Sequence, residues 1–440
     1  MLKHMERTIG SKLLEWKESR QRKPLILRGA RQVGKSFTLK NFGQDNFKNC
    51  VVADFEQKKS LHRVFQKDLV ARNLVQSLEV ELNQRIIPGE TLLFLDEIQA
   101  CPRALMSLRY FFEEMPGLHV AAAGSLLEFS MEEIPFPVGR VDFMRMHPMS
   151  FREFLIARKE EVLLENRPDL TATERRSDSV HDKFMEILKE YFIVGGMPEA
   201  VRMFVETGSY EAVNRVHETL IRSYEEDFPK YGTRVDMDCL MHVYEAVPRH
   251  LGQQIKYTSL YPEKRIESIK AALKVLERAL IIHPVHAADV SGLPLGASAS
   301  GKIFKQVFVD IGLARQMAGI SASRLLNEKD LLHSFRGALA EQYIGQEMVA
   351  VRGGSENDRL YYWVSPGVGD AEVDYLMVED GRILPVEVKS GPAGKLRSLA
   401  QYLLRQPECR EGRVFHGGNI LKTAGSRIRF LPLYTDLRMG

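Results

Sequence analysis

Leu25-Ile-Leu-Arg-Gly29-Ala-Arg-Gln-Val-Gly34-Lys35-Ser36 decides the fold of the first part of this 440-residue chain. The apolar run predicts a buried strand that ends at Gly29, and Phe37-Thr-Leu-Lys continues as the start of a helix. Gly29 to Ser36 fits G-x-x-x-x-G-K-[ST], the phosphate-binding P-loop. Glycines let backbone N–H groups turn toward phosphate oxygens, and the helix N-terminus adds partial positive charge. The alternative is a glycine-rich turn before an ordinary helix. The predicted strand and helix lie where the P-loop motif requires them, which favours the P-loop.

The P-loop pattern predicts a role for each residue of the loop. Lys35 is expected to neutralise the β- and γ-phosphates of a nucleotide, and Ser36 to offer its hydroxyl to Mg²⁺. The predicted nucleotide-binding residues are Gly29, Ala30, Arg31, Gln32, Val33, Gly34, Lys35, Ser36 and Phe37.

A second apolar run, Thr91-Leu-Leu-Phe-Leu-Asp96-Glu97, ends in two carboxylates. Parallel strands that are buried on both faces have this composition, and ligands bind at their carboxyl ends. Asp96 is expected to hold Mg²⁺ through its water shell, and Glu97 to orient or deprotonate the water that attacks the γ-phosphate. The alternative is that the two carboxylates cap a neighbouring helix.

Two further residues are weaker candidates for the same site. Leu118-His-Val-Ala-Ala-Ala-Gly-Ser125 predicts another strand, whose final serine would lie beside the γ-phosphate or be a simple turn serine. Arg140 is the cation nominated to reach the γ-phosphate, in its own or a neighbouring subunit, although an exposed loop arginine is the commoner outcome. Strands that alternate with helices predict a parallel α/β sheet over residues 1–150.

These motifs together resemble a known family. Phe94-Leu-Asp-Glu-Ile-Gln99, Gly139-Arg140, Pro148-Met-Ser-Phe-Arg-Glu-Phe-Leu155 and Gly195-Gly-Met-Pro-Glu199 follow the P-loop in that order. The chain is similar over nearly its whole length to bacterial and archaeal AAA+-type ATPases that carry a C-terminal domain of unknown function. The resemblance implies ATP binding and hydrolysis, and it supplies no established substrate. Ser36 stands where many members have Thr, and either hydroxyl can bind Mg²⁺.

Composition restricts the remaining possibilities. A formal net charge of +3 is too small to imply a nucleic-acid partner, so that inference depends on local patches. The four cysteines are scattered, which favours a reducing compartment over a disulfide framework or a zinc site. No apolar run is long enough to span a bilayer, and no signal peptide is evident, so we expect a cytoplasmic protein without a membrane partner.

The rest of the chain is predicted to form three parts. Residues 151–232 read as a helical lid segment. Residues 233–325 resemble a winged helix, because two helical stretches precede a hairpin. Arg265, Lys270 and Lys274 would lie on its recognition helix, or on an ordinary solvated face. Residues 326–440 return to an α/β pattern.

The last part carries a second set of charged residues. Asp374 and Glu387-Val-Lys389 lie on adjacent predicted strands, and Glu387 and Lys389 project from one face. Carboxylates and a lysine on one sheet face can hold a divalent ion and position a water for phosphodiester attack. This pattern resembles the PD-(D/E)XK nuclease core, with Glu341 as the helix carboxylate and Gln401 on an added helix. The predicted second Mg²⁺ site is Glu341, Asp374 and Glu387; an exposed salt-bridged strand is the alternative.

The sequence therefore supports three functions. The first is an oligomeric, ATP-driven protein that binds and processes nucleic acid, with DNA in preference to RNA. Basic residues between Lys389 and Arg429 would contact phosphate. The second is an ATP-gated regulatory switch whose nuclease-like domain only binds DNA or a partner. The third is an AAA+ protein remodeller.

Overall fold

The computed structural model divides the chain into two compact units. Of the residues described by the structure, those up to residue 147 and residues 230–231 form the first unit, and the others form the second. The structure describes residues 5–124, 139–231, 235–288, 295, 300–327, 336–352, 359–365, 371–389, 396–421 and 426–438.

The first unit is built on a five-stranded sheet in which every pairing is parallel, with the order β2-β3-β4-β1-β5. All six residues of β3 are buried, as a central parallel strand requires. Its elements are α1 (Ile9–Glu18), β1 (Leu25–Arg28), α2 (Lys35–Asn46), β2 (Asn49–Asp54), α3 (Leu61–Val64), α4 (Ala71–Leu82), β3 (Thr91–Asp96), α5 (Pro102–Glu114), β4 (His119–Ala123) and β5 (Asp142–Arg145).

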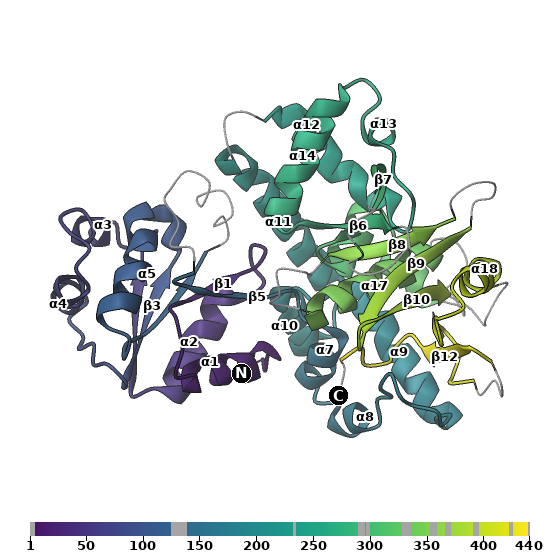
Figure 1. Cartoon of the computed structure of the whole chain (residues 1–440), viewed down its shortest axis with the longest axis horizontal. Helices are drawn as coiled ribbons and strands as arrows, with labels where there is room; N and C mark the ends of the chain where they lie inside the picture. Colours follow the sequence, from purple (N-terminus) through teal and green to yellow (C-terminus); the bar gives the residue numbers. More distant parts are fainter. Residues whose placement is uncertain are drawn as a thin grey trace. The chain divides into compact units, whose positions relative to one another are not determined.

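Helices cover both faces of this sheet (Figure 1). Leu93 and Leu95 of β3 pack in one apolar cluster with residues of α4 and α5. The alternate residue Leu92 lies on the other face, close to Gly43 of α2. The predicted α/β architecture with a parallel sheet is confirmed, and it places the ends of β1 and β3 at one edge, where the P-loop follows β1.

The second unit begins with a helical segment and ends with a mixed sheet. Its elements are α7 (Phe151–Ala157), α8 (Glu161–Glu165), α9 (Asp178–Val194), α10 (Pro198–Thr207), α11 (Tyr210–Asp227), α12 (Met237–Ala246), α13 (Tyr257–Leu260), α14 (Ile266–Arg278), β6 (Ile282–Ala288), β7 (Ser300–Phe308), α15 (Ile311–Met317), α16 (Ala322–Asn327), α17 (Arg336–Arg352), β8 (Leu360–Val364), β9 (Glu372–Glu379), β10 (Arg382–Lys389), α18 (Arg397–Arg405), β11 (Gly412–His416) and β12 (Ile428–Pro432).

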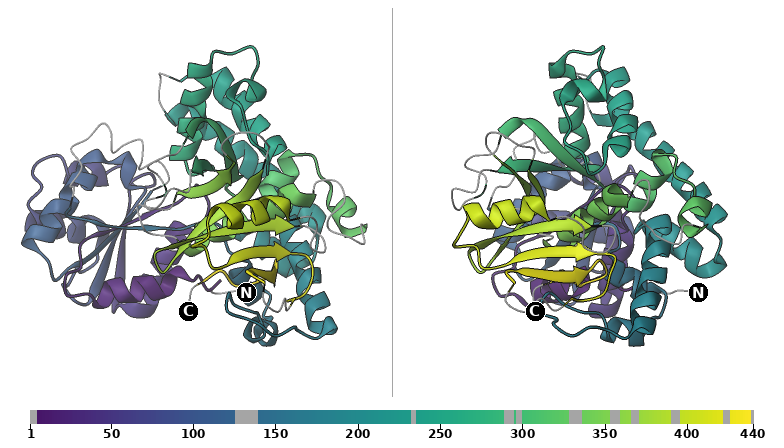
Figure 2. Two further views of the ribbon diagram at one scale, coloured as in Figure 1. Left: turned by 45° about the vertical axis from the view of Figure 1, so that its right-hand side comes forward. Right: turned by 90° about the vertical axis from the view of Figure 1, so that its right-hand side faces the viewer.

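The mixed sheet has seven strands in the order β12-β11-β10-β9-β8-β6-β7. β8, β9 and β10 form an antiparallel meander, and β11 then pairs parallel to β10. α18 lies along the strands β9 and β10 (Figure 2). Leu399 and Tyr402 of α18 are fully buried there, in one cluster with Trp363 and Val414.

The hairpin expected at the end of the predicted winged helix forms, and it has a second set of partners. β6 and β7 pair antiparallel, and β6 also pairs with β8 in register Val285–Leu360. One sheet therefore runs through both the segment 233–325 and the segment 326–440, which the sequence interpretation treated as separate domains. Long-range register of this kind leaves no signal in local residue patterns.

Within the described residues, no helix has the length and apolar character needed to cross a membrane.

Candidate functional site

The loop between β1 and α2 has the backbone that its sequence predicts. Gly34 adopts φ +97°, a left-handed conformation that glycine adopts without a steric penalty, and α2 begins at the next residue. A Cβ on Gly29 would lie 2.3 Å from the Met146 carbonyl oxygen. The first glycine therefore allows β1 and the end of β5 to approach closely, and the second turns the chain into the helix.

The side chain of Lys35 lies inside this loop. Its ammonium donates hydrogen bonds to the carbonyl oxygens of Gly29 and Ala30, both at 2.8 Å. Burial lowers the pKa of Lys35 to about 8, against the opposing pull of Glu97 and Asp96. The loop therefore holds a desolvated ammonium where the P-loop pattern predicts phosphate.

The end of β3 brings both predicted carboxylates to the loop. Asp96 is 2% exposed and accepts a hydrogen bond from the Ser36 hydroxyl at 2.7 Å, and its second oxygen lies 3.2 Å from Lys40 Nζ. Glu97 accepts a hydrogen bond from Gln99 at 2.6 Å, and burial raises its pKa. The hydroxyl and the buried carboxylate together are the hard oxygen donors that Mg²⁺ prefers, so these residues fit that ion.

A pocket of about 330 Å³ opens above these residues. Besides Gly34, Lys35, Ser36 and Glu97, it is lined by Arg31, Gln32, Phe37 and Glu56. Ala30 and Val33 are buried behind the loop. Three residues at or near this site were not predicted from the sequence to belong to it: Glu56, Gln99 and Lys40. The carboxyl-end rule for parallel strands could have indicated Glu56, because it lies two residues after the end of β2.

The two weaker candidates have different outcomes. Ser125 lies outside the described residues. Arg140 does not line the pocket: its Nε lies 3.0 Å from Glu113 Oε1, and its guanidinium lies 5.9 Å from the Phe112 ring centroid. Its side chain remains 47% exposed. In its own subunit, Arg140 is thus a surface arginine in an ion pair.

The second unit gathers Glu341 of α17 with Glu372 and Asp374 of β9. We call these three residues the acidic cluster, because one carboxylate oxygen from each lies within 4.8 Å of the others. Lys305 of β7 contacts Glu341 and Glu372 directly, and its Nζ lies 3.7 Å from Asp374 Oδ1. Glu372 and Lys305 were missed from the sequence. Period-two alternation with Asp374 could have indicated Glu372, whereas no local pattern indicates Lys305.

A strand irregularity positions Asp374. Trp363 pairs with Val373 and Tyr361 with Leu376, so β9 carries one extra residue beside β8 in this stretch. Such a bulge re-aims a side chain, and the Asp374 carboxylate accepts a hydrogen bond from Val388 N at 2.7 Å.

The remaining predicted residues of this set lie on β10 and α18. Glu387 is buried, and one of its oxygens lies 2.5 Å from Lys389 Nζ. Burial, and then the neighbouring Asp374 carboxylate, raise the pKa of Glu387 to about 7. Gln401 is half-buried on α18, and within the described residues it makes no hydrogen bond to the acidic cluster.

Six of the basic residues expected to contact phosphate fall into two groups, whereas Lys395 and Lys422 lie outside the described residues. Arg413 pairs with Glu379 and Glu411, Arg427 donates to backbone carbonyls of residues 403–409, and Arg429 pairs with Glu411. These three arginines are engaged in internal ion pairs and hydrogen bonds. The set of residues expected to contact phosphate was therefore too large. Arg397, Arg405 and Arg410 are exposed.

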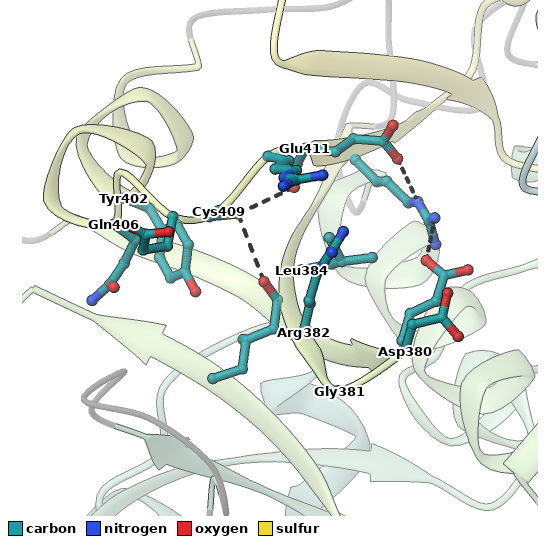
Figure 3. A pocket seen from close by; sticks show the side chains of 13 residues that line it. Asp380, Gly381, Arg382, Leu384, Tyr402, Gln406, Cys409 and Glu411 are labelled. Atoms are coloured by element: carbon teal, nitrogen blue, oxygen red, sulfur yellow. Dashed lines mark hydrogen bonds and ion pairs between the residues drawn. The ribbon is translucent and has the colours of Figure 1, made fainter.

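A larger pocket, of about 630 Å³, lies at the opposite end of the β9–β10 hairpin from the acidic cluster (Figure 3). It is lined by the hairpin turn at residues 379–382, the end of α18 and residues 406–413. Arg413 donates hydrogen bonds to Glu379 and Glu411, so these three charged side chains of the pocket lining are paired with one another. We therefore assign no chemistry to this pocket.

Family models match three consecutive parts of the chain. Residues 21–155 match an AAA domain, residues 185–324 match a domain of unknown function (DUF8612), and residues 336–435 match another (DUF4143). The match to the AAA model coincides with the P-loop, β3 and the parallel sheet. Residues 21–155 therefore form an AAA-type P-loop domain.

Solved structures give distant likenesses. The Holliday junction branch migration motor RuvB of Thermotoga maritima is 12% identical, with 62% of this chain and 87% of that chain covered and a TM-score of 0.30. Orc1 of Aeropyrum pernix in complex with DNA is 10% identical over 71% and 90%, with a TM-score of 0.27. PCH-2 of C. elegans is 13% identical over 47% of this chain, which spans 64% of that protein; the TM-score is 0.27. At these TM-scores we draw no conclusion from the likenesses. No curated protein matches the sequence.

Proposed function

We propose that the chain binds ATP with Mg²⁺ at the P-loop and hydrolyses it. The observation that carries this proposal is the convergence of Lys35, Ser36, Asp96 and Glu97 beside one pocket. Ser36 and Asp96 would hold Mg²⁺, which would supply charge neutralisation at the β- and γ-phosphates. The Lys35 ammonium would then donate hydrogen bonds to phosphate oxygens in place of the carbonyl oxygens of Gly29 and Ala30. Glu97 would take a proton from the attacking water.

Two substitutions test this site. Lys35→Ala should abolish ATP binding, because Lys35 carries the buried ammonium of the P-loop. Glu97→Gln should bind ATP normally and hydrolyse it about 10²–10⁴-fold more slowly, because general bases contribute factors of that size. Glu56→Gln is the matched control, since it changes a carboxylate that lines the same pocket. ATP binding and turnover that survive in Lys35→Ala would refute the proposal.

Arg140 belongs to this proposal as a residue that acts between copies of the chain in a homo-oligomer. Its ion pair with Glu113 is exposed, and solvent-exposed ion pairs contribute little to stability, so a phosphate could replace that partner. A mixing experiment tests the idea. Lys35→Ala copies still carry Arg140, and Arg140→Ala copies still carry an intact P-loop. Mixing the two inactive proteins should restore part of the ATPase activity, and a mixture without activity would argue against action in trans.

The second unit supports a second function, which is the binding and processing of nucleic acid, DNA in preference to RNA. The order α17, β8, β9, β10, α18, β11, with acids on α17, β9 and β10, supports a PD-(D/E)XK-like domain. The oxygens of Glu341, Glu372 and Asp374 are spaced to fit one divalent ion, and Glu387 and Lys389 lie beside them. A divalent ion there would supply Lewis-acid chemistry, and Lys389 would face the phosphate.

A winged-helix-like surface is the proposed docking site for DNA. α12, α13 and α14 precede the β6–β7 hairpin, and Arg265, Lys270 and Lys274 are exposed at or along α14. Replacing Lys270 and Lys274 by alanine should reduce the slope of log affinity against log salt by about 2, because each phosphate contact contributes about 0.9. The exposed Lys183 on α9 is the matched control, and an unchanged slope in the double variant would exclude this surface.

Cleavage is tested separately from binding. The full chain should cut DNA with a divalent ion, and Glu387→Ala should bind DNA without cutting it. If no condition gives cutting and DNA binding persists, the regulatory switch is the better description. Turnover of ATP that responds to unfolded protein and not to DNA would favour the remodeller.

A further inference from the structure

Lys305 is the most unusual residue near the acidic cluster. It is 2% exposed, although a free lysine side chain is normally solvated. Its ammonium contacts Glu341 and Glu372, lies 3.7 Å from Asp374 Oδ1, and sits 5.6 Å from the Tyr362 ring centroid. A buried ammonium is tolerated only when carboxylates or other acceptors surround it. Lys305 is therefore held by the whole cluster and not by a single partner.

The ammonium contacts the same carboxylate oxygens that a divalent ion would bind. The three carboxylate oxygens lie within 4.8 Å of one another, and a divalent ion binds oxygens of this type from a point between them. Lys305 Nζ contacts the same three side chains from such a point. An ammonium and a metal ion cannot share this position, because they would repel each other at contact distance.

A fourth carboxylate, that of Glu387, lies near the acidic cluster and has an oxygen without a partner in the part of the chain that the structure describes. Glu387 Oε2 is buried and has no hydrogen-bond partner among the described residues, while Oε1 of the same carboxylate binds Lys389. Glu387 lies near Asp374, because Asp374 accepts a hydrogen bond from the backbone N–H of Val388, the next residue along β10. A buried oxygen without a partner is costly. It is the kind of atom that a bound cation would satisfy.

We propose that Lys305 is a built-in cation that occupies the divalent-ion position of the acidic cluster, so that a metal ion binds only after the Lys305 ammonium leaves. The inference rests on the proposed nuclease-like function of the second unit and adds its regulation. Lys305 comes from residues 185–324, whereas the acids come from residues 336–435. One family-defined segment thus blocks the site of the next.

The route of release follows from the sheet. The backbone of Lys305 is fixed by its pairing with Val285 of β6, and its neighbour Phe304 bridges to Ile255. The lysine must therefore withdraw either by rotation of its side chain or with a movement of the β6–β7 hairpin. The hairpin follows α14, the proposed DNA-docking helix, and α14 contacts β6. Docking of DNA on α14 would then trigger the release of Lys305.

Mn²⁺ affinity of the full chain tests the inference directly. Titration calorimetry with MnCl₂ would compare the parent with Lys305→Gln, Lys305→Arg and Lys305→Gln/Asp374→Asn. Each protein would carry Asp96→Asn, which removes the P-loop carboxylate as a metal ligand. Lys305→Gln should bind Mn²⁺ at least tenfold more tightly than the parent. Lys305→Arg should bind as weakly as the parent because it keeps the charge, and the double variant should lose the gained affinity.

The results distinguish the failure of this inference from failure of the proposed function. If the parent binds Mn²⁺ through Asp374 and Lys305→Gln binds equally or more weakly, the cation site stands and the role of Lys305 is refuted. If no protein binds Mn²⁺ at millimolar concentration, the cation site itself fails and the inference falls with it.

A second measurement covers the case in which Lys305→Gln does not fold alone. Ions that bind only the folded state stabilise it by mass action. Mn²⁺ should then restore the folded Trp363 fluorescence of Lys305→Gln, because the ion replaces the lost ammonium, and it should not change Lys305→Arg. Lys305→Gln that stays unfolded in millimolar Mn²⁺ would overturn the inference.

Discussion

Gly196→Ala is a single added methyl group with a large expected effect. The Cβ would lie 2.0 Å from the Met149 carbonyl oxygen, far inside van der Waals contact. Two hydrogen bonds hold this glycine in place: Met149 N donates to Gly196 O at 2.6 Å, and Gly196 N donates to Asp310 Oδ2 at 2.6 Å. The methyl group cannot be accommodated unless the backbone segments at residues 149 and 196 separate.

The structure sets the size of the loss. Overpacking a tight interior costs about 1–3 kcal/mol. Weakening a hydrogen bond to a charged acceptor such as Asp310 costs about 1.5–3 kcal/mol more. The free energy of unfolding of the second unit should therefore fall by about 2.5–6 kcal/mol. Gly337→Ala is the matched control, because a Cβ there meets nothing within 4 Å at an exposed position of α17. It should be neutral or slightly stabilising.

The two tryptophans make the measurement specific to one unit. Trp16 lies in the first unit and Trp363 in the second, and both are buried. Urea unfolding of a Trp16→Phe background, followed by fluorescence, therefore reports the second unit alone. A Gly196→Ala midpoint equal to that of Gly337→Ala would refute the reasoning, because it would show that the backbone relaxes around the methyl group at negligible cost.

Three further outcomes are expected. Arg167→Met should cost the second unit about 3–5 kcal/mol in the same assay, because it leaves buried Glu347 without its cation, 3.6 Å away; a loss under 1 kcal/mol would contradict this. Burial lowers the pKa of His217 to about 3, so below pH 6.5 the unfolded state binds a proton that the folded state does not bind. The free energy of unfolding should therefore fall by about 2 kcal/mol between pH 6.5 and 4.5. His217→Gln should flatten that part of the pH–stability profile, and an identical profile would exclude His217. Gly29→Ala should abolish ATP binding, because its Cβ would meet a backbone carbonyl, and the Trp363 transition should not move.

The nucleotide site was the part most open to prediction from sequence. The residues of the P-loop and the end of β3 are contiguous, so a strand, a turn and a helix start can be read directly from their order. Gln99 and Lys40 were harder to foresee. Their contacts depend on the φ of +49° at Glu97 and on the turn of α2 that faces β3.

In the second unit, local sequence patterns predicted some residues near the acidic cluster and not others. The order of Glu341, Asp374, Glu387 and Lys389 could be predicted because each lies in a recognisable helix or strand. Lys305 could not, since it reaches the cluster through the register of a seven-stranded sheet.

Arginines whose partners are distant in sequence were also not predictable from local patterns. Arg167 lies in a polar stretch, yet it is buried and donates hydrogen bonds to the carbonyls of Tyr434 and Thr435. Arg427 binds the backbone carbonyl of Leu403 in a region that suggested a phosphate-binding surface. The charge of an arginine therefore does not show whether its side chain binds a ligand or stabilises the folded chain through internal hydrogen bonds.

The shared sheet of the second unit has a consequence for how this chain is made on the ribosome. The β6–β7 hairpin emerges first, and its partner β8 begins only at Leu360. At 5–20 residues per second, synthesis of residues 309–359 takes roughly 3–10 s. During that interval the edge of β6 has no strand to pair with, and an open edge can recruit other chains. A nascent protein truncated in this window should aggregate, whereas one that includes β8 to β12 should not.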